Sequence, residues 1–94
     1  MFPVPKYRDE LEQKEFIVGI IINGIAKAYP IEKLAVEGKF TDVVAGKKVV
    51  VEYKRESKTP TFVDADGEAI AWVVSYWFAW QAFYPNTLLW DFGE

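Results

Sequence analysis

The fold depends on one stretch, WVVSYWFAWQAFYP at residues 72–85, which holds three of the chain's four tryptophans. An aromatic side chain buries about 150–250 Å², so this stretch alone can organise the core of a small domain. Ser75 is a candidate helix N-cap, and Pro85 marks a point by which the helix has ended. A helix that is apolar on nearly every side is normally enclosed by other elements. We therefore expect a short aromatic helix under a curled antiparallel sheet.

Three β-hairpins are predicted before this helix. The first joins residues 16–22 to residues 25–29 through Asn23-Gly24, the strongest short signal for a hairpin turn. The second joins residues 39–44 to residues 48–53, and the third joins residues 61–63 to residues 68–73. Gly19, inside the first strand, suggests a bulge or a tight bend.

Two further elements complete the predicted fold. Pro30 fits the first position of a single-turn helix that Glu37-Gly38 closes, and the alternating residues 88–92 predict a closing strand. The fold class is α+β, mostly β: an antiparallel hairpin meander curled into a barrel or half-barrel around a short aromatic-rich helix. Residues 1–14 are predicted to form an N-terminal arm, and residues 15–94 a single small β-rich domain.

Composition excludes several classes of function. The chain has 94 residues and a net charge of −3, from 14 acidic and 11 basic residues, and shows no basic footprint for nucleic acid. It contains no Cys and no His, which excludes disulfides, thiolate metal sites and cysteine nucleophiles and removes the commonest general base. The longest apolar tract, residues 69–84, is shorter than the ~20 residues that span a bilayer. The first residues lack the pattern of a secretory signal peptide.

Three segments in order resemble a known family. They are GIIINGIAKAYP at residues 19–30, DVVAGKKVVVEY at residues 42–53 and WFAWQAFYPNT at residues 77–87. Their order is similar to the strand, (A/R)AYP box, short helix, N-D-x-V-G-G turn, V-x-V-x-Y strand and W-x-x-(W/F)…x-P-x-T close of the prokaryotic family called domain of unknown function 3179. The chain resembles one portion of that family, and the resemblance implies a fold and an exported parent protein.

The chain departs from the family pattern where chemistry would be expected. Typical members carry a His-Glu pair before the Asn-Asp turn and a Cys-Pro-Leu-Cys run after the tyrosine. The corresponding positions here hold Glu37-Gly38 and residues 54–56, Lys-Arg-Glu. The metal or redox chemistry that those His and Cys residues imply is therefore not expected of this chain.

Polar candidate sites lie in two places. Asp64-x-Asp66-Gly67-Glu68 is similar to the start of a calcium loop, but Asp and Gly are also the residues that a tight turn requires. Tyr29, Asp42 and Tyr53 occupy family-matched positions near strand ends. A Tyr–Asp pair there could bind a polar ligand, act as a weak acid/base couple, or form a hydrogen bond that ties a turn to its neighbour.

The aromatic residues allow two interpretations as well. They could form the core, or they could form a surface that stacks on sugars, flat apolar ligands or a partner. The set consists of Tyr76, Trp77, Trp80, Tyr84 and Trp90. We predict a small soluble domain that acts as a non-catalytic binding or protein-interaction module. One alternative is a structural or accessory portion of a larger exported protein with no ligand of its own. The other is an enzyme that pairs a carboxylate with Tyr29 or Tyr53, the candidate carboxylates being Asp42, Asp64 and Glu52.

The resulting predictions include no catalytic residue, cofactor or metal. The partner is a second copy of the chain or another domain of a parent chain, with no nucleic acid and no membrane span. The candidate ligand or partner surface consists of Tyr29, Asp42, Tyr53, Trp77, Trp80 and Trp90.

Overall fold

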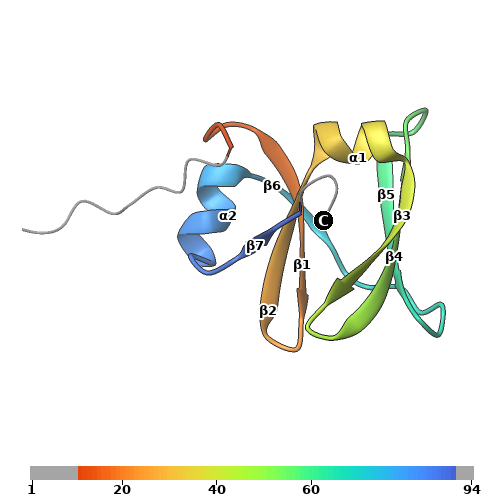
Figure 1. Cartoon of the computed structure of the whole chain (residues 1–94). Helices are drawn as coiled ribbons and strands as arrows, with labels where there is room; N and C mark the ends of the chain where they lie inside the picture. The colour runs from red at the N-terminus through yellow and green to blue at the C-terminus, as the bar shows by residue number, and fades with distance from the viewer. Residues whose placement is uncertain (1–10, 91–94) are drawn as a thin grey trace, which may run out of the picture.

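The computed structural model describes residues 11–90, which form two β-sheets and two short helices. Sheet A has the strand order β6-β1-β2-β7 and sheet B the order β3-β4-β5. Sheet A contains β1 (Phe16–Ile22), β2 (Ile25–Pro30), β6 (Val73–Tyr76) and β7 (Leu88–Leu89). Sheet B contains β3 (Lys39–Val44), β4 (Lys47–Lys54) and β5 (Thr59–Asp64). The helices are α1 (Ile31–Glu37) and α2 (Trp77–Phe83), and Figure 1 shows α1 between the ends of the two sheets.

The first two predicted hairpins are confirmed. Asn23 and Gly24 have φ values of 51° and 80°, which the two central residues of a type I′ turn require. Ala45 and Gly46 make a similar turn between β3 and β4, with φ values of 52° and 75°. The predicted helix after Pro30 is also confirmed, although Pro30 is its N-cap and not its first residue.

The third predicted hairpin is wrong beyond its turn. The backbone N–H of Gly67 donates to the carbonyl of Asp64 at 3.0 Å, so the turn forms, but only an isolated bridge between Val63 and Ala69 follows it. The chain then crosses to sheet A, where β6 pairs with β1 (Figure 1). This crossing brings α2 to the uncovered face of sheet A, where its tryptophans can be buried.

The predicted α+β, mostly β fold class is confirmed. Of the predicted barrel or half-barrel around the helix, no closed barrel forms within residues 11–90. The central strands of sheet A, β1 and β2, carry buried residues on both faces. One face packs against sheet B through a core that includes Val18, Ile20, Tyr29, Val49, Val51 and Phe62. The other face is covered by α2, whose Trp77 and Trp80 pack on Ile17, Ala26 and Ala28. Alternate residues of β1 and β2 are apolar on both sides, so each face needs its own cover, and the helix lies outside the pair of sheets.

The start of α2 differs from the prediction at Ser75, which lies in β6. Tyr76 is the N-cap and makes no side-chain capping bond. The backbone N–H groups of Trp77 and Phe78 donate instead to the carbonyls of Glu15 and Gln13, at 2.8 and 2.9 Å. Backbone carbonyls of the segment that precedes β1 thus accept the N–H groups that the side chain of a cap residue would otherwise satisfy. Of the predicted arm, residues 1–10 lie outside the described residues.

The predicted closing strand is shorter than expected and has the opposite direction. β7 contains only Leu88 and Leu89 and runs parallel to β2, so sheet A is mixed. The backbone N–H of Trp90 donates to the carbonyl of Ala28 at 2.9 Å and extends the contact by one residue. Residues 91 and 92 of the predicted strand lie outside the described residues. β7 can pair parallel to β2 because α2 and the loop after it connect β6 to β7 across the face of the sheet.

Candidate functional site

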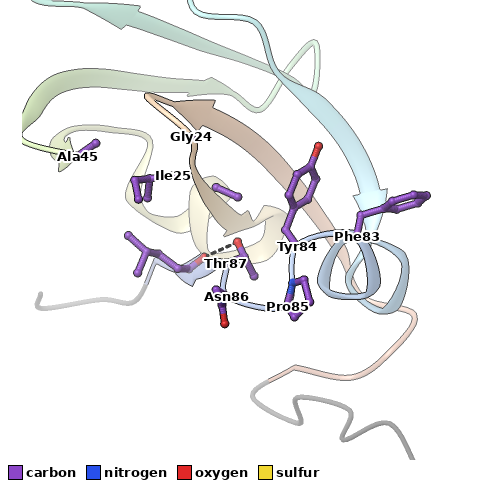
Figure 2. Close-up of a pocket in the computed structure, with 10 residues that line it drawn as sticks. Gly24, Ile25, Ala45, Phe83, Tyr84, Pro85, Asn86 and Thr87 are labelled. Carbon is purple, nitrogen blue, oxygen red and sulfur yellow. Dashed lines mark hydrogen bonds between the residues drawn. The ribbon is translucent and has the colours of Figure 1, made fainter.

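A pocket of about 570 Å³ lies where the C-terminal end of α2 meets two hairpin turns, and we call it the α2 pocket. The segment from the end of α2 to β7 forms one wall, and the β1–β2 and β3–β4 turns form the other. Figure 2 shows Tyr84 and Pro85 on one side, opposite Ile25 and Ala45. The lining residues are Gly24, Ile25, Ala26, Ala45, Phe83, Tyr84, Pro85, Asn86, Thr87 and Leu88.

The lining of the α2 pocket is mostly apolar and carries no charged side chain. It contains no Asp, Glu, Lys or Arg side chain. Three apolar residues on it are well exposed: Ile25 at 41%, Leu88 at 45% and Phe83 at 82%. The ring of Phe83 points outward from the pocket (Figure 2), so the apolar surface continues past its rim. Concave sites with mostly apolar walls are the usual places for ligands or anchoring side chains of a partner.

Trp80 positions the wall that α2 contributes. Its indole Nε1–H donates to the Oγ1 of Thr87 at 2.8 Å, and Thr87 Oγ1 in turn donates to the carbonyl of Leu88 at 3.0 Å. The Trp80 ring also packs against Tyr84, with 4.5 Å between ring centroids. These contacts hold both sides of the turn at Pro85 to one buried side chain.

Gly19 allows Trp80 to reach this position. Of the bulge or tight bend predicted at Gly19, the bulge is absent, because β1 keeps a continuous register with β2 through this residue. A Cβ atom at Gly19 would lie 2.7 Å from Cε3 of Trp80 and closer still to the neighbouring ring atoms. The glycine therefore leaves room for the indole to lie directly on the strand, another role of Gly within strands.

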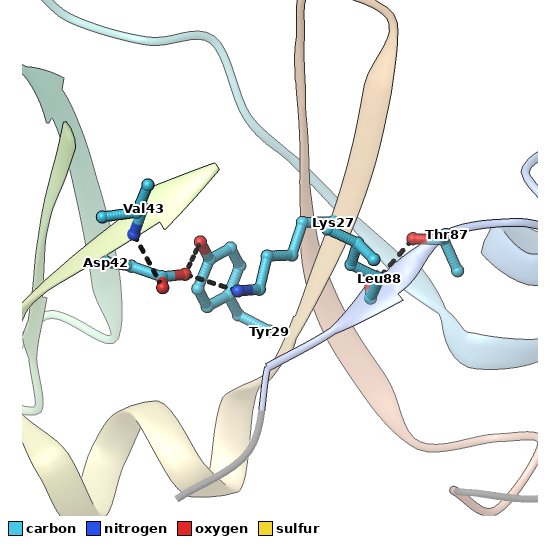
Figure 3. A network of polar contacts seen from close by, with 6 residues as sticks. All are labelled: Lys27, Tyr29, Asp42, Val43, Thr87 and Leu88. Atoms are coloured by element: carbon cyan, nitrogen blue, oxygen red, sulfur yellow. Dashed lines mark hydrogen bonds and ion pairs between the residues drawn. The ribbon is translucent and has the colours of Figure 1, made fainter. Parts of the chain in front are cut away.

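A polar network links the two sheets at the Tyr29–Asp42 pair. The hydroxyl of the fully buried Tyr29 donates to Oδ2 of Asp42 at 2.6 Å, and the Nζ of Lys27 lies 2.7 Å from the same oxygen. The backbone N–H of Val43 donates to the other carboxylate oxygen at 2.8 Å (Figure 3). Of the alternatives for this pair, a hydrogen bond is present, but it does not tie a turn to its neighbour: it joins β2 of sheet A to β3 of sheet B.

The pKa shifts in this network stabilise a neutral tyrosine and a charged carboxylate. Burial, the hydrogen bond to Asp42 and the charge of Asp42 together raise the pKa of Tyr29 far above its usual value. Burial alone would raise the pKa of Asp42, but hydrogen bonds from Lys27, Tyr29 and Val43 and the charge of Lys27 outweigh it and lower that pKa. Neither group therefore has a pKa near neutrality, where a general acid or base works best.

Replacing Asp42 with asparagine is expected to lower the free energy of unfolding by about 1–3 kcal/mol at neutral pH, because Lys27 loses the charge that compensates its burial. The folded pKa of Asp42 is lowered, so its stabilisation is fully present above the unfolded value of about 3.9 and is lost as pH falls through the folded pKa. The difference between wild type and Asp42→Asn should therefore shrink in acid. Urea unfolding of both proteins across the acid range measures it.

Comparing the two proteins at each pH removes the contribution of Glu15. Burial, and then the charges of Glu32 and Glu12, raise the pKa of Glu15, so its titration affects stability in the opposite direction. That effect is common to both proteins and cancels in the difference. A difference that does not change with pH would contradict the assignment of Asp42 as the charged centre of the network.

The other two candidate carboxylates, those of Asp64 and Glu52, lie away from the network around Asp42. Oδ1 of Asp64 accepts the backbone N–H groups of Asp66 and Glu68 at 2.9 and 3.0 Å, so this segment forms the turn. Asp42 faces the core between the sheets, whereas Glu52 occupies an alternate position of β4 on its outer face. Within residues 11–90 no three Asp or Glu side chains cluster in a way that could hold a metal ion. None of the helices described is long and apolar enough to cross a membrane.

The predicted surface residues occupy two separate cores. Tyr29, Tyr53 and Trp90 belong to the core between the sheets, with Asp42 at its edge, and Trp77 and Trp80 belong to the core under α2. All five aromatic residues are at least nine-tenths buried. Their role in a ligand or partner surface stays a prediction.

Apart from Tyr84, the residues that line the α2 pocket were not predicted as site residues. Two of the residues missed in the sequence hold these sites in place by polar contacts. Lys27 is one, and its position opposite Ile20 in the β1–β2 register could have indicated a charge entering the sheet interior. Thr87 is the other, with only 2% of its surface exposed. Thr87 is the T of the x-P-x-T close in the family resemblance, and that was its only signal, because its partner Trp80 is brought near by the turn at Pro85.

The fold and the pocket define a small α+β domain of two packed sheets, with an apolar, uncharged site beside its second helix. The chain belongs to the family described as Protein of unknown function (DUF3179), whose model matches residues 1–69. The predicted resemblance is thereby confirmed, although residues 77–87 lie outside the matched range. Searches of curated proteins and of solved structures found no match.

Proposed function

We propose that this domain is a non-catalytic binding module that takes apolar side chains of a partner polypeptide in the α2 pocket. The observation that carries the proposal is the pocket itself, about 570 Å³ in volume and lined without a single Asp, Glu, Lys or Arg. Its volume lies within the ~300–1,000 Å³ of typical binding sites. An uncharged site favours an uncharged occupant, since a buried charge would have no partner there.

The exposed rings favour a polypeptide over a small molecule. Phe83 stands at the rim with 82% of its surface exposed, and its ring points away from the pocket (Figure 2). A small molecule inside the pocket would leave this ring in water. A partner chain could fill the pocket with one side chain and cover Phe83 with the next, as aromatic contacts do in many protein interfaces.

In this proposal the six residues predicted for the ligand or partner surface do not contact the partner. They hold in place the elements that form the α2 pocket. Trp80 holds the wall from Tyr84 to Thr87, and Trp77 anchors α2 on sheet A. Tyr29, Asp42, Tyr53 and Trp90 hold sheet A against sheet B. Ile25 and Ala26 enter the pocket from sheet A, so the shape of the site depends on both cores.

Peptides selected from a random library displayed on phage test the proposal. We expect the selected peptides to carry large apolar residues and to shift the NMR methyl resonances of Ile25 and Leu88. Ile25→Ser and Phe83→Ser should each raise the Kd of such a peptide by about tenfold or more, measured by calorimetry. The matched control is Val36→Ser, since Val36 is 68% exposed on α1 and does not line the pocket.

The two substitutions also separate a polypeptide from a small ligand. A small molecule bound inside the pocket would respond to Ile25→Ser and not to Phe83→Ser. Selected peptides that tolerate both substitutions, or a library that yields no binder, would overturn the proposal. The second result would favour the alternative of a structural or accessory unit with no ligand of its own, for which the open outer edge of β6 is the supporting observation.

A further inference from the structure

The outer edge of sheet A at β6 has no strand beside it among residues 11–90. β6 is first in the strand order of the sheet and pairs only with β1. An edge of this kind presents unpaired backbone donors and acceptors that another strand can use. This edge lies apart from the α2 pocket, since no residue of β6 lines that pocket.

The register decides which backbone groups of β6 point outward. The backbone N–H of Trp77 donates to the carbonyl of Glu15. Along two antiparallel strands, pairs of opposite residues alternate between hydrogen-bonded and non-hydrogen-bonded. Ser75, two residues before Trp77, therefore turns its N–H and C=O toward β1. Val74 and Tyr76 turn theirs away from the sheet. The Tyr76 carbonyl accepts the Ser75 hydroxyl at 3.0 Å and keeps its second lone pair.

The β6 edge carries no charged side chain that would keep another strand from pairing with it. Residues 69–90 contain no Asp, Glu, Lys or Arg, whereas the edge strand β3 of sheet B contains Lys39 and Asp42. Charged residues are a common means of keeping edge strands from pairing. On β6, Val74 is 49% exposed and Tyr76 is 41% exposed.

A stack of three rings makes the edge rigid as well as apolar. Phe16 stacks on Tyr76 with 4.5 Å between ring centroids and 20° between ring planes, and Phe78 also stacks on Tyr76, at 5.8 Å and 19°. Phe16 and Phe78 are 49% and 41% exposed. The ring that a partner strand would contact is therefore already held in place.

We propose that two copies of this chain pair their β6 strands antiparallel, about a two-fold axis at Ser75, and join their four-stranded sheets into one. In this register Val74 lies opposite Tyr76 of the second copy, so every outward N–H and C=O of these two residues meets a partner. The side chains then form Val–Tyr cross-strand pairs, a favourable aromatic and β-branched combination. The arrangement is self-complementary, as a two-fold interface requires, and this favours a second copy as the occupant.

A single cysteine at the proposed axis tests this register. Ser75 would lie opposite its own counterpart in a non-hydrogen-bonded pair, with Cα atoms about 4.5 Å apart, within the range that a disulfide spans. The chain contains no Cys, so in Ser75→Cys every disulfide must join two copies. Mild oxidation should convert most of this variant to a dimer on a non-reducing gel. Val43→Cys is the matched control, an exposed residue on the edge strand β3, and should stay largely monomeric.

Substitution of Val74 by proline tests the backbone contacts. Val74→Pro removes an outward N–H without removing a bond to β1, so the sheet should remain folded by circular dichroism while light scattering reports a monomer. The unsubstituted chain should be a dimer at micromolar concentration. A monomeric unsubstituted chain, or equal crosslinking of Ser75→Cys and Val43→Cys, would overturn the proposal. If Val74→Pro does not fold, the comparison of the two cysteine variants decides the question.

Discussion

Replacing Trp77 with alanine is expected to lower the free energy of unfolding by about 3–5 kcal/mol, because the cavity left by a large buried ring is not refilled. The Trp77 side chain is fully buried and packs with Ile17 and Ala28 under α2. Domains of this size unfold with about 5–15 kcal/mol, so this one substitution removes a large share of the stability. Urea unfolding followed by circular dichroism measures the loss.

Phe83→Ala is the matched control on the same helix. Phe83 is 82% exposed, so its removal should change the free energy of unfolding by no more than about 0.5 kcal/mol. The comparison separates an aromatic residue that holds the fold from one that is offered to a partner. Similar losses in the two variants would show that α2 does not use Trp77 as its anchor.

Replacing Gly19 with alanine is expected to lower the free energy of unfolding by about 1–3 kcal/mol, the usual cost of overpacking. The added Cβ would overlap the ring of Trp80. The indole would have to move and would strain its bond to Thr87 and its contact with Tyr84. Because these contacts shape the α2 pocket, the same substitution should also weaken peptide binding there.

A double-mutant cycle with Trp80→Leu identifies the cause of this loss. The shorter side chain leaves space above the strand, so Gly19→Ala should cost less in the Trp80→Leu protein than in wild type. Additive losses would mean that Gly19 matters for another reason, such as the conformation of the strand. Denaturant unfolding of the four proteins provides the coupling free energy.

The predictions from the sequence were most accurate for local structure. Asn23-Gly24 and the β-branched residues around it specify a hairpin within a few residues, and the turn at Asp64 to Gly67 forms for a similar local reason. A hydrogen bond between Tyr29 and Asp42 was one of the three alternatives for this pair, although not between strands of two sheets. The part that Lys27 takes in this network was not predicted, because nothing in its local sequence shows that β3 of the other sheet will bring a carboxylate to it.

The predictions failed where partners are distant in the chain. Ser75 has the side chain of a helix cap but lies in a strand, because pairing with β1 and the carbonyls of Glu15 and Gln13 decide where α2 begins. Residues 68–73 look like the return strand of a hairpin, but burial of Trp77 and Trp80 on sheet A takes the chain away from β5. Tertiary burial overrides local propensity in both cases.

The sequence by itself determined that this protein is a mostly β domain built from hairpins, with no His or Cys and with an aromatic helix that must be buried. Turn residues and the alternation of apolar side chains act within a few positions, so they can be read from the chain alone. Only the tertiary structure decided that the helix covers the outer face of sheet A, that β6 becomes an open edge and that Trp80 shapes a pocket beside Thr87. These features depend on which of two apolar faces each element covers, and that choice is made by packing between segments far apart in the chain.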